Sequence, residues 1–398
     1  MKLFQKLLLA PAALGLFAPI AANANESNFR DVTSYSQDQV EVSLDSFKPL
    51  SNKNPLLAGG EGGNQSQTSN DFDIDTFSST TQASFTSNFA IGTVEGNSST
   101  DDLGVNYDWE LALTTSFTGN DSLDVVMNAG VSALYTELDM TSTSSIVKVD
   151  SASYTTLLGD KSTVYIGAGD GVAGSALYNT ACVYGAQTDT FSNCGVSAAN
   201  IDEGLGTALG FNFDLGYGFN ATVGYEGQGM TKGLLNQEST DAHGFQLSYL
   251  QDNYGVSGSW ANIERHATVN SVANTVINGS VHSVAINGYY APDLPNFPSI
   301  SAGFESNHDD TVSGTTTDNT SHYFVGIQWD DFGNGTLGAA FGSKEAYAEN
   351  ADALAMYEVF YSYNYADGIT ITPLLYSKEN AGATADETGI VLKTQFSF

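Results

Sequence analysis

Apolar and polar residues alternate one by one along most of the chain from about residue 77 to the C-terminus. In the segment 105–117, one parity carries Val105, Tyr107, Trp109, Leu111, Leu113 and Phe117, and the other carries Asn106, Asp108, Glu110, Thr114 and Ser116. Successive side chains of a strand point to opposite faces, so this pattern predicts strands with one apolar and one polar face.

About sixteen such segments follow one another, which is an even number, as in outer-membrane barrels. They begin near Phe77, Val105, Leu123, Ile146, Thr163, Leu205, Phe219, Ala242, Gly255, Gly279, Pro298, Ser321, Thr336, Leu354, Ile369 and Glu387. Short turns are expected after the even-numbered segments and longer polar loops after the odd-numbered ones. We therefore predict an all-β fold, a transmembrane antiparallel β-barrel over 76–398. A soluble β-sandwich would also alternate, but without this regular change of loop length.

The last strand supports a membrane barrel. Ile390, Leu392, Phe396 and Phe398 share one face, and the sequence given ends on Phe398. An exposed apolar edge invites aggregation, whereas a closed barrel has no edge and needs an apolar outer face toward lipid. We expect this strand to pair with the first strand, near Phe77, and Phe398 to lie at the periplasmic rim.

The N-terminal residues predict export. Lys2 and Lys6 precede an apolar run over 7–20, and Ala22-Asn23-Ala24 follows as a cleavage site, so 1–24 is interpreted as a secretory signal peptide. No other stretch approaches the roughly 18 continuous apolar residues of a spanning helix. Residues 25–75 are rich in Ser, Asn, Gln and Gly and predict a periplasmic extension or linker. The expected location is the outer membrane.

The chain is strongly acidic. It has 12 Lys and Arg against 45 Asp and Glu; without the two signal-peptide lysines, 12 − 2 = 10 basic residues remain and the net charge is 10 − 45 = −35. Such acidity argues against nucleic-acid binding, because phosphate contacts need Lys and Arg. A soluble, halophile-type surface would explain the charge but not the alternating aromatic residues.

The longest connection, 170–204, follows the fifth strand and holds both cysteines, Cys182 and Cys194. In an exported protein these two are expected to form a disulfide. A loop closed by this disulfide would set the pore width if it folds inward. On the outer surface, the disulfide would only make the loop resistant to proteases. The acidic candidates for a constriction on this loop are Asp170, Asp189, Asp202 and Glu203.

The polar parity of the strands supplies the candidate pore-lining charges. They are Asp108, Glu110, Asp124, Lys148, Asp150, Asp214, Glu226, Glu305, Glu358 and Lys393. Carboxylates around a pore favour cations, so we expect weak cation preference. The alternative is that many acidic residues lie on external loops and are merely solvated.

Other chemistry finds little support in the sequence. Gly169–Gly174 matches G-x-G-x-x-G, but neither the helix nor the crossover of a nucleotide-binding fold follows. The five histidines lack metal-ligand spacing, and the adjacent His282 and Ser283 point to opposite faces of a strand, so they cannot act as a base and nucleophile pair. We expect no enzyme activity, no cofactor and no metal.

Several segments resemble cyanobacterial outer-membrane porins of the carbohydrate-selective (OprB-type) family. They are the signal segment 1–24, Tyr107-Asp108-Trp109-Glu110-Leu111, Thr115–Gly119, Pro298–Phe304, Val325–Asp330, Ile369–Pro373 and the final Phe398. The resemblance covers the chain from about Phe77 to Phe398.

The resemblance implies a 16-stranded, trimeric channel for small solutes and ions, with Phe398 similar to the signal that the barrel assembly machinery reads. Sugar specificity is not carried over. Residues 25–76 are too short for the S-layer-homology domain usual in this family, so peptidoglycan binding is not expected. The alternative function is a structural or adhesive outer-membrane barrel without an open pore.

Overall fold

The computed structural model describes most of the chain beyond residue 80. The described ranges are 81–96, 102–132, 136–138, 140–196, 198–235, 239–270, 275–294, 296–310, 319–343, 347–348, 353–380 and 385–398, of which 136, 198, 265–270, 275–278 and 347–348 are described by their backbone alone. The predicted signal peptide and extension, 1–75, lie outside these residues. Within them, no helix has the length and hydropathy needed to cross a membrane.

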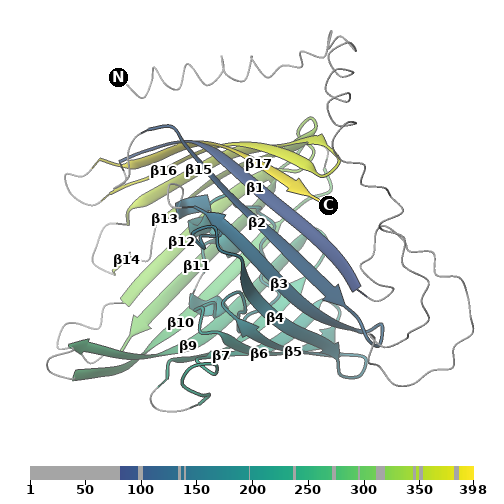
Figure 1. Cartoon of the computed structure of the whole chain (residues 1–398), viewed down its shortest axis with the longest axis vertical. Helices are drawn as coiled ribbons and strands as arrows, with labels where there is room; N and C mark the ends of the chain where they lie inside the picture. Colours follow the sequence, from purple (N-terminus) through teal and green to yellow (C-terminus); the bar gives the residue numbers. More distant parts are fainter. Residues whose placement is uncertain are drawn as a thin grey trace, which may run out of the picture. The chain divides into compact units, whose positions relative to one another are not determined.

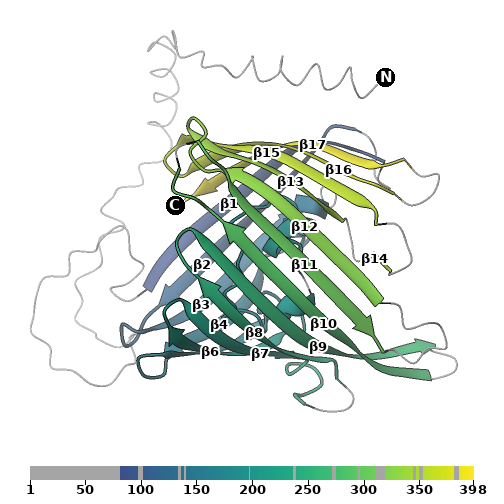
Figure 2. The same cartoon turned by 180° about the vertical axis from the view of Figure 1, so that it is seen from behind.

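The described part of the chain is built almost wholly of strands (Figures 1 and 2). The strands are β1 (Thr81–Glu95), β2 (Gly104–Thr115), β3 (Asp121–Val131), β4 (Lys148–Leu157), β5 (Ser162–Gly169), β6 (Thr207–Gly216), β7 (Phe219–Gly227), β8 (Asp241–Leu250), β9 (Tyr254–Asn270), β10 (Thr275–Tyr290), β11 (Ser299–Asp309), β12 (Asn319–Trp329), β13 (Gly335–Ser343), β14 (Tyr347–Ala348), β15 (Ala355–Ala366), β16 (Ile369–Lys378) and β17 (Glu387–Ser397).

The strands close into an antiparallel barrel of sixteen strands. The two-residue β14 is not counted as a separate strand of the barrel, because it pairs with β12 while β13 pairs directly with β15. The seam is formed by β1, which pairs with β2 on one side and with β17 on the other. Asn88, for example, lies opposite Asp108 of β2 and opposite Gln395 of β17. The predicted fold class and the predicted pairing of first and last strands are confirmed.

The predicted strand starts agree with the observed ones to within four residues. The predicted loop lengths are wrong at two places. The connection after the tenth strand, 291–298, is as long as the one after the first strand, 96–103, although a short turn was expected there. The connection after the ninth strand spans only 271–274, because β9 and β10 both continue to this point and pair as far as Asn270 and Thr275.

The outer and inner faces of the barrel differ in chemistry. Exposed apolar side chains occupy the outward parity, including Phe245, Trp260, Val284, Ile286, Phe304, Val325 and Tyr357. The inward parity carries small and polar residues such as Gln246, Ser257, Ser301 and Gln328. An apolar band outside and a polar interior are what a barrel in lipid requires.

Candidate functional site in the barrel interior

The chain between β5 and β6 folds against the inner wall of the barrel. This segment, 170–206, is called the long loop below; it contains two short 3-10 helices, η3 (Asp189–Cys194) and η4 (Ala198–Asn200). Ala181, Phe191 and Ala199 of the loop are fully buried.

An extended stretch of the long loop, 179–187, crosses the inner wall from β8 to β15. Every second backbone N–H donates a hydrogen bond to a wall side chain. The pairs are Asn179 to Gln246 Oε1 (2.5 Å), Ala181 to Ser257 Oγ (2.9 Å), Val183 to Ser301 Oγ (3.1 Å), Gly185 to Gln328 Oε1 (2.8 Å) and Gln187 to Glu358 Oε2 (3.1 Å). The wall's backbone groups are already used between strands, so wall side chains must satisfy the loop's buried donors.

Three predicted pore-lining glutamates lie beneath this loop. Glu226, Glu305 and Glu358 are at most 1% exposed. Glu226 accepts hydrogen bonds from the backbone N–H groups of residues 203 and 205, and Glu305 Oε2 accepts one from the N–H of Ala199 at 3.0 Å. These carboxylates hold the loop on the wall.

Glu358 has the most specific contacts of the three. Its Oε1 accepts a hydrogen bond from the Tyr184 hydroxyl at 2.7 Å, and its Oε2 accepts one from the N–H of Gln187 at 3.1 Å. Burial, with the nearby Glu358 charge, raises the pKa of the Tyr184 phenol far above its usual value. Tyr184 therefore stays protonated and remains a donor.

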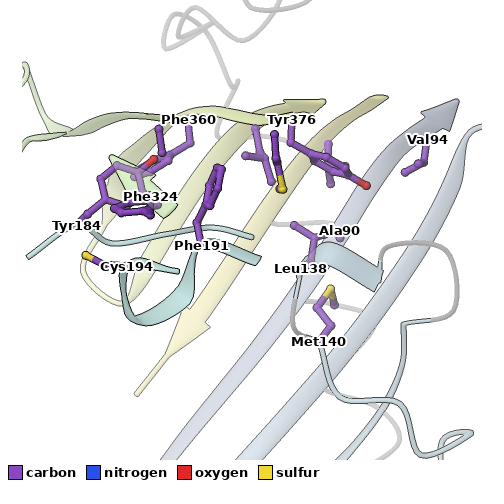
Figure 3. Close-up of a cluster of buried hydrophobic side chains, with 14 residues drawn as sticks. Ala90, Val94, Leu138, Met140, Tyr184, Phe191, Cys194, Phe324, Phe360 and Tyr376 are labelled. Carbon is purple, nitrogen blue, oxygen red and sulfur yellow. The ribbon is translucent and has the colours of Figure 1, made fainter. Parts of the chain in front are cut away.

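Aromatic packing and a disulfide complete the attachment of the loop. The Tyr184 ring centroid lies 5.3 Å from that of Phe324 and 5.9 Å from that of Phe360, and the Phe191 centroid lies 5.2 Å from that of Phe324 (Figure 3). Cys182 and Cys194 form the predicted disulfide, which ties the extended stretch to the end of η3. The loop is thus fixed on both its apolar and its polar side.

The other predicted site residues that lie on strands form two groups, and those on the long loop form a third. Asp108, Glu110, Asp124, Lys148 and Asp150 come from the adjacent strands β2, β3 and β4, whereas Asp214 and Lys393 lie apart from them on β6 and β17. Of the acids on the long loop, Asp170, Asp189, Asp202 and Glu203 are all exposed.

The β2–β4 group mixes buried and accessible charges. Asp108 is buried and accepts hydrogen bonds from Asn88 Nδ2 (2.8 Å) and the N–H of Thr141 (2.9 Å). Glu110 and Lys148 are exposed, and Asp150 is half-buried, with its Oδ1 accepting a hydrogen bond from Asn128 Nδ2 at 2.9 Å. The accessible inward charge therefore concentrates on this sector of the wall.

Reasoning from the sequence missed a second segment that enters the interior. The β3–β4 connection, 132–147, carries the 3-10 helix η2 (Thr136–Leu138), whose Glu137 forms an ion pair with Lys378 of β16 at 2.7 Å. Lys378 lies on β16 at an even position, like the inward-facing Thr372. This alternation was the one sequence signal that placed Lys378 on the inner face. Nothing local identified Glu137.

Solved outer-membrane proteins share this fold. OprB of Pseudomonas putida has a TM-score of 0.58 at 12% identity, covering 80% of this chain and 94% of that one. OmpT of Vibrio cholerae, in its trimer form, has a TM-score of 0.54 at 10% identity, covering 80% and 99%. Salmonella typhi OmpF in complex with daunomycin has 0.50 at 12% identity, covering 80% and 98%.

No family model and no curated protein matches the sequence. The structural likeness defines the class of fold: this chain has a porin-type fold, a closed antiparallel β-barrel of sixteen strands.

Proposed function

We propose that this protein is an outer-membrane porin, a water-filled channel through which small hydrophilic solutes and ions diffuse passively. The observation that carries the proposal is the combination of a closed, outwardly apolar barrel with an inward loop and accessible charges on the inner face of β2–β4. A water-filled path along polar and charged side chains is the usual use of such an interior.

The channel is proposed to prefer cations weakly. Glu110, Asp124 and Asp150 are accessible on the inner parity of β2–β4, against Lys148 in the same sector. Accessible carboxylates attract cations, whereas the buried carboxylates of Glu226 and Glu358 accept hydrogen bonds from the long loop and do not face water. Selectivity therefore follows the β2–β4 sector together with the exposed acids of the loop.

Carbohydrate selectivity does not form part of the proposal. A sugar-binding track needs aromatic faces open to the pore. The inward-facing Tyr165, Phe324 and Phe360 are buried, the latter two beneath the long loop. Sugars belong to the proposed solutes only as small hydrophilic molecules.

The location and assembly follow the same proposal. The chain is exported by a signal peptide at 1–24, carries a periplasmic extension at 25–75, and inserts in the outer membrane as a homotrimer, without a cofactor, enzyme activity or peptidoglycan binding. The C-terminal Phe398 is 84% exposed, and its backbone exchanges hydrogen bonds with that of Phe85 at 2.8 and 3.1 Å. An exposed aromatic at the seam is accessible to the barrel assembly machinery.

A second candidate is a structural or adhesive barrel without an open pore. It is favoured by the apolar cluster inside the barrel, where loop residues such as Phe191 and Leu138 pack against the wall. Such packing fills part of the interior.

Planar-bilayer recording of the purified protein distinguishes the two functions. The porin proposal expects stable, ohmic single-channel steps and a reversal potential of cationic sign in a salt gradient. A barrel that never conducts supports the second candidate, and a clear anion preference contradicts the proposed selectivity.

A further inference from the structure

The β3–β4 connection is anchored inside the barrel by its apolar residues. Leu138 and Met140 are buried and belong to the same cluster as Ala90 and Val94 of β1 (Figure 3). The N–H of Thr141 donates to Asp108 Oδ2 at 2.9 Å, so this segment is also held to β2. It follows that η2 lies within the barrel and not on an outer surface.

Glu137 of η2 connects three elements that are distant in the sequence. Its Oε1 lies 2.7 Å from Lys378 Nζ of β16, and its Oε2 accepts a hydrogen bond from Thr190 Oγ1 of η3 at 2.9 Å. Lys378 Nζ lies 3.5 Å from Glu387 Oε1 of β17. One carboxylate therefore bridges the barrel wall and the long loop.

These charged side chains are largely removed from water. The exposed fraction is 16% for the side chain of Lys378, 11% for Glu137 and 13% for Glu387. Breaking a buried ion pair at one partner is strongly destabilising, because the remaining charge is left uncompensated. Without Lys378, the two carboxylates would also repel each other.

We infer that Glu137 and Lys378 are positioning residues that hold the β3–β4 connection and the long loop together as a single constriction, and thereby set the width of the pore. The inference rests on the proposed porin function for its effect on conductance. Its structural content, two loops held by one ion pair, can be measured separately.

The test compares Lys378→Met with Lys148→Met in the full-length, refolded protein. Both variants remove one lysine from the inward parity, but Lys148 is exposed. Lys148→Met should shift the reversal potential toward stronger cation preference, because Lys148 is exposed on the inner face. Only Lys378→Met should raise the occupancy of brief, larger-conductance openings, by roughly ten-fold or more, because only it leaves buried charges unpaired.

Hydrogen exchange of the same proteins supplies the second measurement. Peptides covering 136–147 and 184–194 should exchange faster in Lys378→Met and at the wild-type rate in Lys148→Met. The double variant Glu137→Gln/Lys378→Met removes the repulsion between Glu137 and Glu387 but still lacks the ion pair, so it should exchange more slowly than Lys378→Met and faster than the wild type. If Lys378→Met does not fold, Glu137→Gln takes its place, since Lys378 keeps Glu387 as a partner.

Equal exchange and equal channel noise in the two lysine variants would overturn the inference. A wild-type barrel that does not conduct contradicts the proposed function. The exchange rates of the two loops would still decide whether the ion pair holds them together.

Discussion

Replacing Glu358 by alanine should release the middle of the long loop from the wall while leaving the barrel intact. Glu358 is fully buried on β15 and accepts hydrogen bonds from the Tyr184 hydroxyl and the Gln187 N–H. The barrel itself depends on backbone pairing between strands, which the substitution does not touch.

The magnitude follows from the two lost contacts. Hydrogen bonds to a charged group contribute about 1.5–3 kcal/mol each, so two of them contribute about 3–6 kcal/mol to docking of the loop. Since about 1.4 kcal/mol is a factor of ten in an equilibrium constant, the ratio of docked to undocked loop should fall by roughly 10²–10⁴. Glu358→Gln keeps an acceptor oxygen and should show a much smaller effect.

Single-channel recording measures this release as excess open-channel noise and brief larger openings. Glu110→Gln is the matched control, because Glu110 is exposed on the inward parity and makes no contact with the long loop among those described. Glu110→Gln should weaken cation preference without added noise, and Glu358→Gln should leave the reversal potential nearly unchanged. Quiet channels from Glu358→Ala, or a reversal-potential shift from Glu358→Gln as large as that from Glu110→Gln, would refute the reasoning.

Three further outcomes are expected. Replacing both Cys182 and Cys194 by serine should destabilise the loop by about 3 kcal/mol and make it more sensitive to protease, with the barrel still heat-resistant on gels; unchanged cleavage would argue against a role in fixing the loop. Deleting Phe398 removes two backbone hydrogen bonds at the seam and should reduce insertion into the outer membrane in cells far more than the conductance of the inserted protein; wild-type insertion would contradict this. Asp150→Asn should weaken cation preference in the same direction as Glu110→Gln, as measured by reversal potential, and an opposite shift would exclude Asp150 from the pore.

Much of the fold could be predicted from local pattern. The two-residue period of apolar side chains is imposed by lipid on every strand of a barrel, so it is present in each segment separately. This is why the strand count, the start of β7 at Phe219 and the seam between β1 and β17 were predicted correctly. The short connection between β9 and β10 was not, because the loop length depends on where two strands stop pairing.

The candidate site shows the limit of the same reasoning. Parity placed Glu110 and Glu358 on the inward face and could not distinguish them. Tertiary structure decided that Glu110 is exposed and Glu358 is buried. Glu358 is covered by Gln187 and Tyr184 of the long loop, which are separated from it by 171 and 174 positions in the chain.

The ion pair between Glu137 and Lys378, 241 positions apart, has the same origin. The sequence by itself determined that the chain closes into a barrel with an apolar outer face and a polar inner one, since the alternation of apolar and polar residues is present in each strand separately. Only the tertiary structure decided which inward charges face water and which hold the loops, because that depends on how two connections fold back over the wall.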